Sequence, residues 1–198
     1  MEEAPVTRAS LLLRIRDGRD HEAWRQFVQI YAPVVYGFAR KRGLQDADAA
    51  DLMQEVLRSV AGAAGRLNYD PQRGSFRAWL YTVTRNKIYS FLDGRRRHVR
   101  GSGDSGTQQR LEKHAAPEED TVAQWDREYE RQLFAWAAEQ VRGEFSEKTW
   151  QSFWLTAVEG QNAKAVSQRF GMSPGAVYVA KSRVLARLRE QVQQVQED

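Results

Sequence analysis

The segment from Asn162 to Arg189 contains the pattern that most limits how this chain can fold: a helix, a tight turn and a second helix. Small or apolar residues at helical spacing indicate the buried side of the first helix, and Gly171 supplies a turn position where a left-handed backbone costs little. Ser173 before Pro174 is typical of a helix start, because serine caps free amides and proline there loses no hydrogen bond. The buried positions are Ala163, Val166 and Phe170. The pattern predicts a helix-turn-helix.

The predicted helix-turn-helix is strongly basic. Between Asn162 and Glu190 the bases are Lys164, Arg169, Lys181, Arg183, Arg187 and Arg189, and the only acid is Glu190. This excess suits a surface that faces DNA phosphates. Taken alone, the segment fits a DNA reader and a packed helical hairpin about equally well, because short motif matches are often accidental.

Composition limits the class of protein. At 198 residues with 41% apolar content, the chain has room for one domain or two small helical ones. It contains no cysteine, which excludes disulfides and thiolate metal sites and fits a reducing compartment. No apolar run approaches the roughly 20 residues that span a bilayer. We therefore expect a soluble cytoplasmic protein without membrane insertion.

Apolar stripes at three- and four-residue intervals predict three helices in the N-terminal half. The first starts at His21 and has Pro33 as a candidate break. The second starts after the acidic stretch at Asp46, where carboxylates favour a helix N-terminus, and ends near Gly62 to Gly65. The third runs from Phe76 to Phe91. These helices predict one compact N-terminal unit.

The composition changes after Arg97 to a glycine- and serine-rich stretch, and apolar periodicity returns only near Val122. We therefore predict an N-terminal helical domain over residues 1–98, a flexible linker over 99–121 and a C-terminal domain of four helices over 122–198. No useful strand-type alternation occurs. The expected fold class is all-α, with two small helical domains joined by a flexible linker and the helix-turn-helix in the second.

A second basic stretch, from Arg66 to Arg100, carries nine bases and two acids. Within it Arg77, Tyr81 and Arg85 follow at four-residue steps and share one helix face. Such a face can hold phosphates with its cations and stack a base on its aromatic ring. The alternative is a solvated face with Tyr81 closing the core.

An acidic patch lies between Gln45 and Glu55 and contains no base. Its acids are Asp46, Asp48, Asp51 and Glu55. The patch either docks a basic partner or simply keeps a helix soluble, and the residues alone leave both readings open.

Nothing in the sequence predicts catalysis. The three histidines, His21, His98 and His114, are far apart, and the stretch starting at Asp46 lacks the glycine and final glutamate of a calcium loop. We expect no catalytic residue, no metal and no cofactor. A magnesium-dependent nuclease using the acidic patch is a remote alternative, because a second carboxylate cluster is missing.

Three ordered motifs together resemble the extracytoplasmic-function sigma factors of bacterial RNA polymerase, which belong to the sigma-70 superfamily. They are the acidic Asp51-Leu52-Met53-Gln54-Glu55-Val56, the run from Phe76 to Asn86 and the C-terminal helix-turn-helix. The resemblance covers about Asp20 to Glu190. It implies a region 2 type N-terminal domain and a region 4 type C-terminal domain.

The resemblance also implies site residues. Those expected to bind the clamp helices of the polymerase β′ subunit are Asp48, Asp51, Gln54 and Glu55. Those expected at the promoter −10 element are Asn68, Tyr69, Asp70, Arg73, Ser75, Arg77, Tyr81, Arg85 and Asn86, with the loop before Phe76 receiving a flipped base. Those expected at the −35 element are Ser173, Pro174, Ala176, Tyr178, Lys181, Ser182, Arg183 and Arg187. Many family members carry a basic-Ser-Arg triplet where this chain has Tyr178-Val179-Ala180.

The function implied by the resemblance is that of a sigma factor without enzymatic activity. It would bind core RNA polymerase, direct it to promoter DNA through the two elements and assist strand melting. An anti-sigma protein is a further partner that the resemblance leaves open. The alternative is a stand-alone helix-turn-helix regulator that binds its operators without polymerase.

Overall fold

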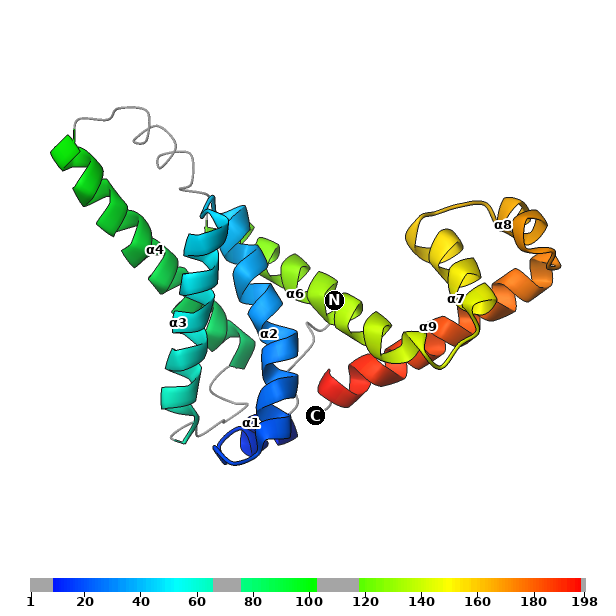
Figure 1. The fold of residues 1–198 in the computed structure, drawn as a ribbon, viewed down its shortest axis with the longest axis horizontal. Helices are drawn as coiled ribbons and strands as arrows, with labels where there is room; N and C mark the ends of the chain where they lie inside the picture. Colours follow the sequence, from blue (N-terminus) through cyan, green and yellow to red (C-terminus); the bar gives the residue numbers. More distant parts are fainter. Residues whose placement is uncertain (1–8, 66–75, 103–117, 197–198) are drawn as a thin grey trace. The chain divides into compact units, whose positions relative to one another are not determined.

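The computed structural model describes residues 9–65, 76–102 and 118–196, and every regular element within these ranges is helical. This confirms the predicted all-α fold class. Two compact units follow one another along the chain (Figure 1). The first takes in the described residues up to Gln132, and the second runs from Leu133 to Gln196.

Helices that bury one apolar side form the N-terminal unit. They are α1 (Ala9–Arg14), α2 (His21–Lys41), α3 (Asp46–Ala64), α4 (Phe76–Ser102) and the part of α6 (Glu118–Arg142) that ends at Gln132. α2 and α3 lie side by side (Figure 1). α2 starts where the Asp20 carboxylate accepts a hydrogen bond of 2.9 Å from the Ala23 amide, which satisfies a free donor at the helix start.

The core of this unit is aromatic. Phe27 and Tyr31 on α2 have ring centroids 4.8 Å apart, and both meet Phe76 of α4 edge-on, at 5.8 and 5.7 Å. All three side chains are buried. Edge-on contacts bring the positive rim of one ring against the negative face of another. They fix α4 against α2, which sets the position of the predicted −10 residues on α4.

The candidate break at Pro33 is wrong, because α2 continues through this residue without interruption. Proline inside a helix removes one backbone hydrogen bond and normally bends or breaks the helix. Here buried residues lie on both sides of it, with Ile30 and Tyr31 before and Val34 and Val35 after. Burial of this apolar face stabilises the helix against the local cost.

Two features near the ends of the predicted N-terminal domain differ from expectation. α1 was not anticipated, although Leu11 and Leu12 within it and Ile15 directly after it are buried. Its six residues are too few for a helical period to stand out. α4 continues to Ser102, so the predicted linker starts inside a helix. Most of that linker lies outside the described residues.

The boundary between the two units also differs from the prediction. The sequence places residues from 122 onward in the C-terminal domain, whereas the first part of α6, up to Gln132, groups with the N-terminal unit. The physical reason is burial. Trp125 and Tyr129 are almost completely buried against aromatic residues of α2 and α4, so one continuous helix serves both units.

The C-terminal unit contains the remaining part of α6 and three further helical segments, in agreement with the four predicted helices. α7 (Glu147–Phe153) widens into the π-helical turn η2 (Trp154–Val158), and α8 (Ala163–Phe170) precedes α9 (Pro174–Gln196). Ser146 caps α7 by accepting a hydrogen bond from the Thr149 amide at 3.3 Å. This unit presents the helix-turn-helix.

Candidate nucleic-acid interface

The acidic patch lies on the outer side of α3. Leu52 and Val56 are buried on the inner side, while Asp51, Gln54 and Glu55 are exposed. This split follows from helical geometry, because residues one turn apart share a face. The three polar residues therefore form one accessible surface, as a docking site requires.

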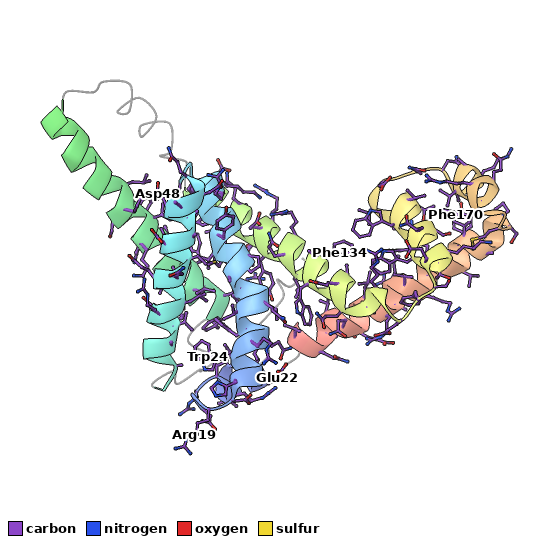
Figure 2. The ribbon with its side chains drawn as sticks, in the orientation of Figure 1. Arg19, Glu22, Trp24, Asp48, Phe134 and Phe170 are labelled. Atoms are coloured by element: carbon purple, nitrogen blue, oxygen red, sulfur yellow. The ribbon has the colours of Figure 1, made fainter. Side chains whose placement is uncertain are left out.

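The two remaining acids of the patch are less available to a partner. Asp48 is half-buried near the start of α3, where Figure 2 labels it. Asp46 accepts a hydrogen bond of 3.0 Å from the Tyr36 hydroxyl and pairs with Arg40 at 2.8 Å. These contacts tie the start of α3 to α2. Asp46 thus has a structural role, whereas Asp51 is available to a partner.

On α4 the predicted DNA-binding face is largely covered. The Arg77 side chain is only 8% exposed, and its Nη2 lies 3.1 Å from Oδ1 of Asp126 on α6. Its guanidinium carbon also lies 4.8 Å from the centre of the Tyr129 ring, also on α6. Arg77 was expected on the surface, and it is instead held inside the N-terminal unit.

Tyr81 is buried as well, so the alternative in which it closes the core describes this structure. Its ring lies 6.0 Å from that of Phe38 and 5.8 Å from that of Trp125. Burial raises the pKa of the Tyr81 hydroxyl above its usual value, with partial opposition from Arg85. The guanidinium of Arg85 lies 5.6 Å from the Tyr81 ring centre.

The other predicted −10 residues divide into two groups. Asn86 is exposed and Arg85 is half-buried, so both have a path to a ligand. The remainder lie outside the described residues: Asn68, Tyr69, Asp70, Arg73 and Ser75.

The residues of α6 that pack against α2 and α4 were not identified as site residues from the sequence. They are Trp125, Asp126, Glu128 and Tyr129, all in the first half of α6. The sequence does carry one signal, because two aromatics four residues apart are followed and interleaved by acids. Only the tertiary structure shows that Asp126 meets Arg77 of α4 and that Glu128 meets Lys41 of α2.

The helix-turn-helix has the predicted local geometry. Gly171 adopts φ 57° and ψ 44°, the left-handed conformation that glycine reaches without strain. The Ser173 hydroxyl accepts a hydrogen bond of 3.1 Å from the Ala176 amide, and Pro174 is the first residue of α9. The turn glycine and the cap expected from the sequence are both confirmed.

A small apolar cluster holds the two helices together. It contains Leu155, Val166 and Val177, with Ala163, Phe170 and Met172 packed against it. Figure 2 labels Phe170 at the end of α8. The predicted buried face of α8 is therefore correct. Since Val177 faces this cluster, the opposite side of α9 must face solvent.

The outward side of α9 presents most of the predicted −35 residues. Exposed among them are Ser173, Pro174, Tyr178, Ser182 and Arg183, and half-buried are Ala176, Lys181 and Arg187. Tyr178 is 63% exposed and its neighbour Val179 is 58% exposed. Large side chains this open on a well-packed helix are accessible to a ligand.

Arg187 differs from the other predicted −35 residues because it is already paired. Its Nε and Nη2 donate to the two carboxylate oxygens of Glu144 at 2.7 and 2.8 Å, and Glu190 lies 3.7 Å away. The hydrogen bonds to Glu144 raise the pKa of Arg187. This bidentate pair ties α9 to the segment after α6 and gives Arg187 a structural partner.

Other site types can be tested in the described part of the chain. There, no group of three or more histidine, aspartate or glutamate side chains is placed to hold a metal ion. Within the same ranges, the helices are too polar or too short to cross a bilayer.

Comparison with known proteins connects these features to a family. Residues 27–98 match the family model for sigma-70 region 2. The ECF RNA polymerase sigma factor RpoE of Cereibacter sphaeroides is 35% identical over 88 residues, covering 44% of this chain and 46% of that protein. The ECF RNA polymerase sigma factor ShbA of Streptomyces griseus is 29% identical over 146 residues, covering 73% of this chain and 71% of that protein. The first alignment thus spans less than half of the relative's length.

Among solved structures, CnrH in complex with the cytosolic domain of CnrY is 20% identical and covers 93% of this chain and 96% of that chain, with a TM-score of only 0.35. The sequence matches are more informative. The stretch from residue 27 to 98 contains the exposed acidic motif of α3 and the α4 run from Phe76 to Asn86. Residues 27–98 therefore match a sigma-70 region 2, and the chain is similar to extracytoplasmic-function sigma factors.

Proposed function

We propose that this protein is an initiation factor that binds core RNA polymerase, brings it to promoters through −10 and −35 elements and helps to separate the strands. It does so by binding alone, without enzymatic activity, in the cytoplasm where the polymerase works. The observation that carries the proposal is the match of residues 27–98 to sigma-70 region 2, with the acidic motif of that region exposed on α3.

The polymerase contact is assigned to the outer side of α3. Asp51 and Gln54 are exposed there, and Glu55 is 56% exposed although it lies 3.3 Å from Lys87 of α4. Asp48 contributes from a half-buried position. Carboxylates on a rigid helix can orient a basic partner surface and speed its encounter. The partner is the clamp helices of the polymerase β′ subunit.

The −35 contact is assigned to the outward side of α9. The helix-turn-helix geometry allows the start of such a helix to enter the major groove, where each base pair has a distinct pattern of donors and acceptors. Arg183 and Ser182 are exposed and can reach base edges or phosphates. Tyr178 adds an exposed aromatic ring to the same side of α9.

The −10 contact is assigned to α4 and to the loop before it. Asn86 and Arg85 are accessible or partly so, whereas Arg77 and Tyr81 reach DNA only after α6 has moved away. Unpaired bases expose their edges and faces to a protein pocket, and capture of such bases supports strand opening. An anti-sigma protein that restrains the factor is compatible with this assignment and is a further proposed partner.

Run-off transcription with purified core polymerase and a promoter library tests the proposed function. We expect transcripts that start downstream of a shared pair of elements and that require the protein. A gel shift without polymerase is the matched control. Tight sequence-specific binding in the absence of polymerase, together with no stimulated transcription, would instead support a stand-alone regulator.

A further inference from the structure

The first half of α6 packs into a site that α2 and α4 form on the N-terminal unit. We call this site the α6 seat and define it by Tyr31, Gly37, Phe38 and Lys41 of α2 and Arg77 and Tyr81 of α4. Trp125 enters it with 1% exposure and lies 5.3 Å from the Phe38 ring. Tyr129 enters with 0% exposure and stacks on Tyr31 at 5.8 Å.

A glycine makes room for a buried carboxylate in the seat. Glu128 has a fully buried side chain, and a Cβ atom at position 37 would collide with its Oε1. The carboxylate is satisfied by Lys41 at 2.7 Å, Arg131 at 2.5 Å and Gln132 at 2.7 Å. A buried charge with this many donors specifies one position for the helix, because leaving it unpaired is costly.

The chemistry that α6 presents is that of a single DNA strand. Asp126 and Glu128 offer anionic oxygens to Arg77 and Lys41, as phosphates would. Tyr129 offers a ring face to the Arg77 guanidinium, as a base would. Arg77 cannot make these contacts and DNA contacts together. Occupation of the seat and strand binding at Arg77 are therefore mutually exclusive.

The seat is also imperfect, which favours release. Within the described ranges, the Trp125 Nε1 is buried and has no hydrogen-bond partner. Such a group costs free energy in the closed state that is recovered on opening. The first half of α6 is thus packed well enough to be ordered, and its unsatisfied polar group lowers the free-energy cost of displacing it.

We propose that the first half of α6 is an internal substitute for the −10 single strand, which keeps the α6 seat closed in the free factor and leaves it when promoter DNA is opened. The proposal rests on the proposed function. It assigns a regulatory role to the start of the helix that also begins the C-terminal unit.

A disulfide lock gives the sharpest test. The chain contains no cysteine, and a Cβ at position 37 would lie 3.4 Å from Cγ of Glu128, so Gly37→Cys with Glu128→Cys places two thiols within bonding reach. The double variant is bound to core polymerase, and opening of a −10 element is followed by the fluorescence of 2-aminopurine. Each single-cysteine variant serves as a redox control.

We expect the oxidised double variant to open the promoter at least about tenfold less than the reduced form, with full recovery after reduction. Equal opening in both redox states would overturn the proposal. If the wild-type protein opens no promoter with core polymerase, the proposed function itself fails. These two failures are distinguishable, because only the second affects the wild type.

An opposite variant opens the seat instead of locking it. Gly37→Leu fills the space that Glu128 requires, while leucine favours the helical backbone more than glycine does. If the closed form exceeds the open form by about tenfold, the factor concentration for half-maximal opening falls by about tenfold. Gly62→Leu on α3 is the matched control, since a Cβ there meets nothing within 4 Å. An unchanged concentration for a folded Gly37→Leu protein would contradict the proposal.

Discussion

The two units hold their predicted DNA-contacting residues in opposite states. On α9 the exposed Tyr178, Ser182 and Arg183 face solvent, whereas on α4 Arg77 and Tyr81 are covered by α6. The difference matches the two forms of DNA that the proposed function involves. A −35 duplex exists before the factor arrives, but a melted −10 strand does not. A surface for the first can stay open, while a surface for the second is covered until needed.

The largest expected effect is a loss of stability that distinguishes the permanent core of the N-terminal unit from the first half of α6, which we propose can detach. Phe27→Ala should lower the free energy of unfolding of the N-terminal unit by about 3 to 5 kcal/mol, because the buried Phe27 ring of α2 packs against Phe76 of α4. Trp125→Ala should cost about 1 kcal/mol, since the unit survives release of α6. Chemical denaturation measures both. Similar losses for the two variants would show that α6 is permanent core.

Charge reversal on α3 tests whether the exposed acidic side of α3 binds polymerase independently of the α4 face that α6 covers. Asp51→Lys should weaken binding to core polymerase by about 2 to 3 kcal/mol, because it places a like charge against a basic partner. The fold should persist, as Asp51 is exposed. Co-purification and circular dichroism measure the two properties. Glu22→Lys, an exposed site on α2, is the matched control.

A pair of arginine variants sharpens the comparison within α9. Arg183→Ala should weaken −35 binding by about 1 to 3 kcal/mol if the side chain reads a base. Arg183 is exposed and forms no ion pair with the rest of the described chain, whereas Arg187 is held by Glu144. Arg187→Ala should therefore lower stability more than it changes promoter choice. A promoter mutation series with thermal unfolding distinguishes the outcomes, and a reversed ranking would refute the assignment.

A smaller effect is expected at the turn of the helix-turn-helix. Gly171→Ala places a side chain on a backbone with φ 57°, and nothing else lies within 4 Å of the new Cβ. The loss should be about 1 kcal/mol from backbone strain alone. Gly143→Ala, which also meets open space but has no positive φ, is the control for calorimetry.

The smallest effect at neutral pH concerns Glu128. Burial opposes its charge, but hydrogen bonds from Arg131, Lys41 and Gln132 outweigh burial and lower its pKa. A lowered pKa in the folded state adds stability above the ordinary carboxyl pKa, and this stability is lost as pH falls through the folded value. The α6 seat should therefore loosen only in acid. Glu128→Gln should remove that pH dependence in hydrogen exchange, with the wild type as reference.

Local sequence patterns predicted most of the helices, because each depends on residues within a few turns of one another. The start of α9 is an example, since Ser173 and Pro174 act on the adjacent backbone. The same local reasoning failed at Pro33, where burial of α2 outweighed a residue that usually breaks helices. It also failed at the domain boundary. A change in composition shows where buried residues become sparse, but it does not show which unit the next helix packs against.

The sequence by itself determined the all-helical fold, the helix-turn-helix and the exposed acidic motif, since spacing along one helix decides which residues share a face. Only the tertiary structure decided which faces are covered. Arg77 and Asp126 lie 49 positions apart in the chain, and no local period connects them. Contacts between distant segments depend on how whole helices pack, so the closure of the α6 seat could be read only from the folded protein.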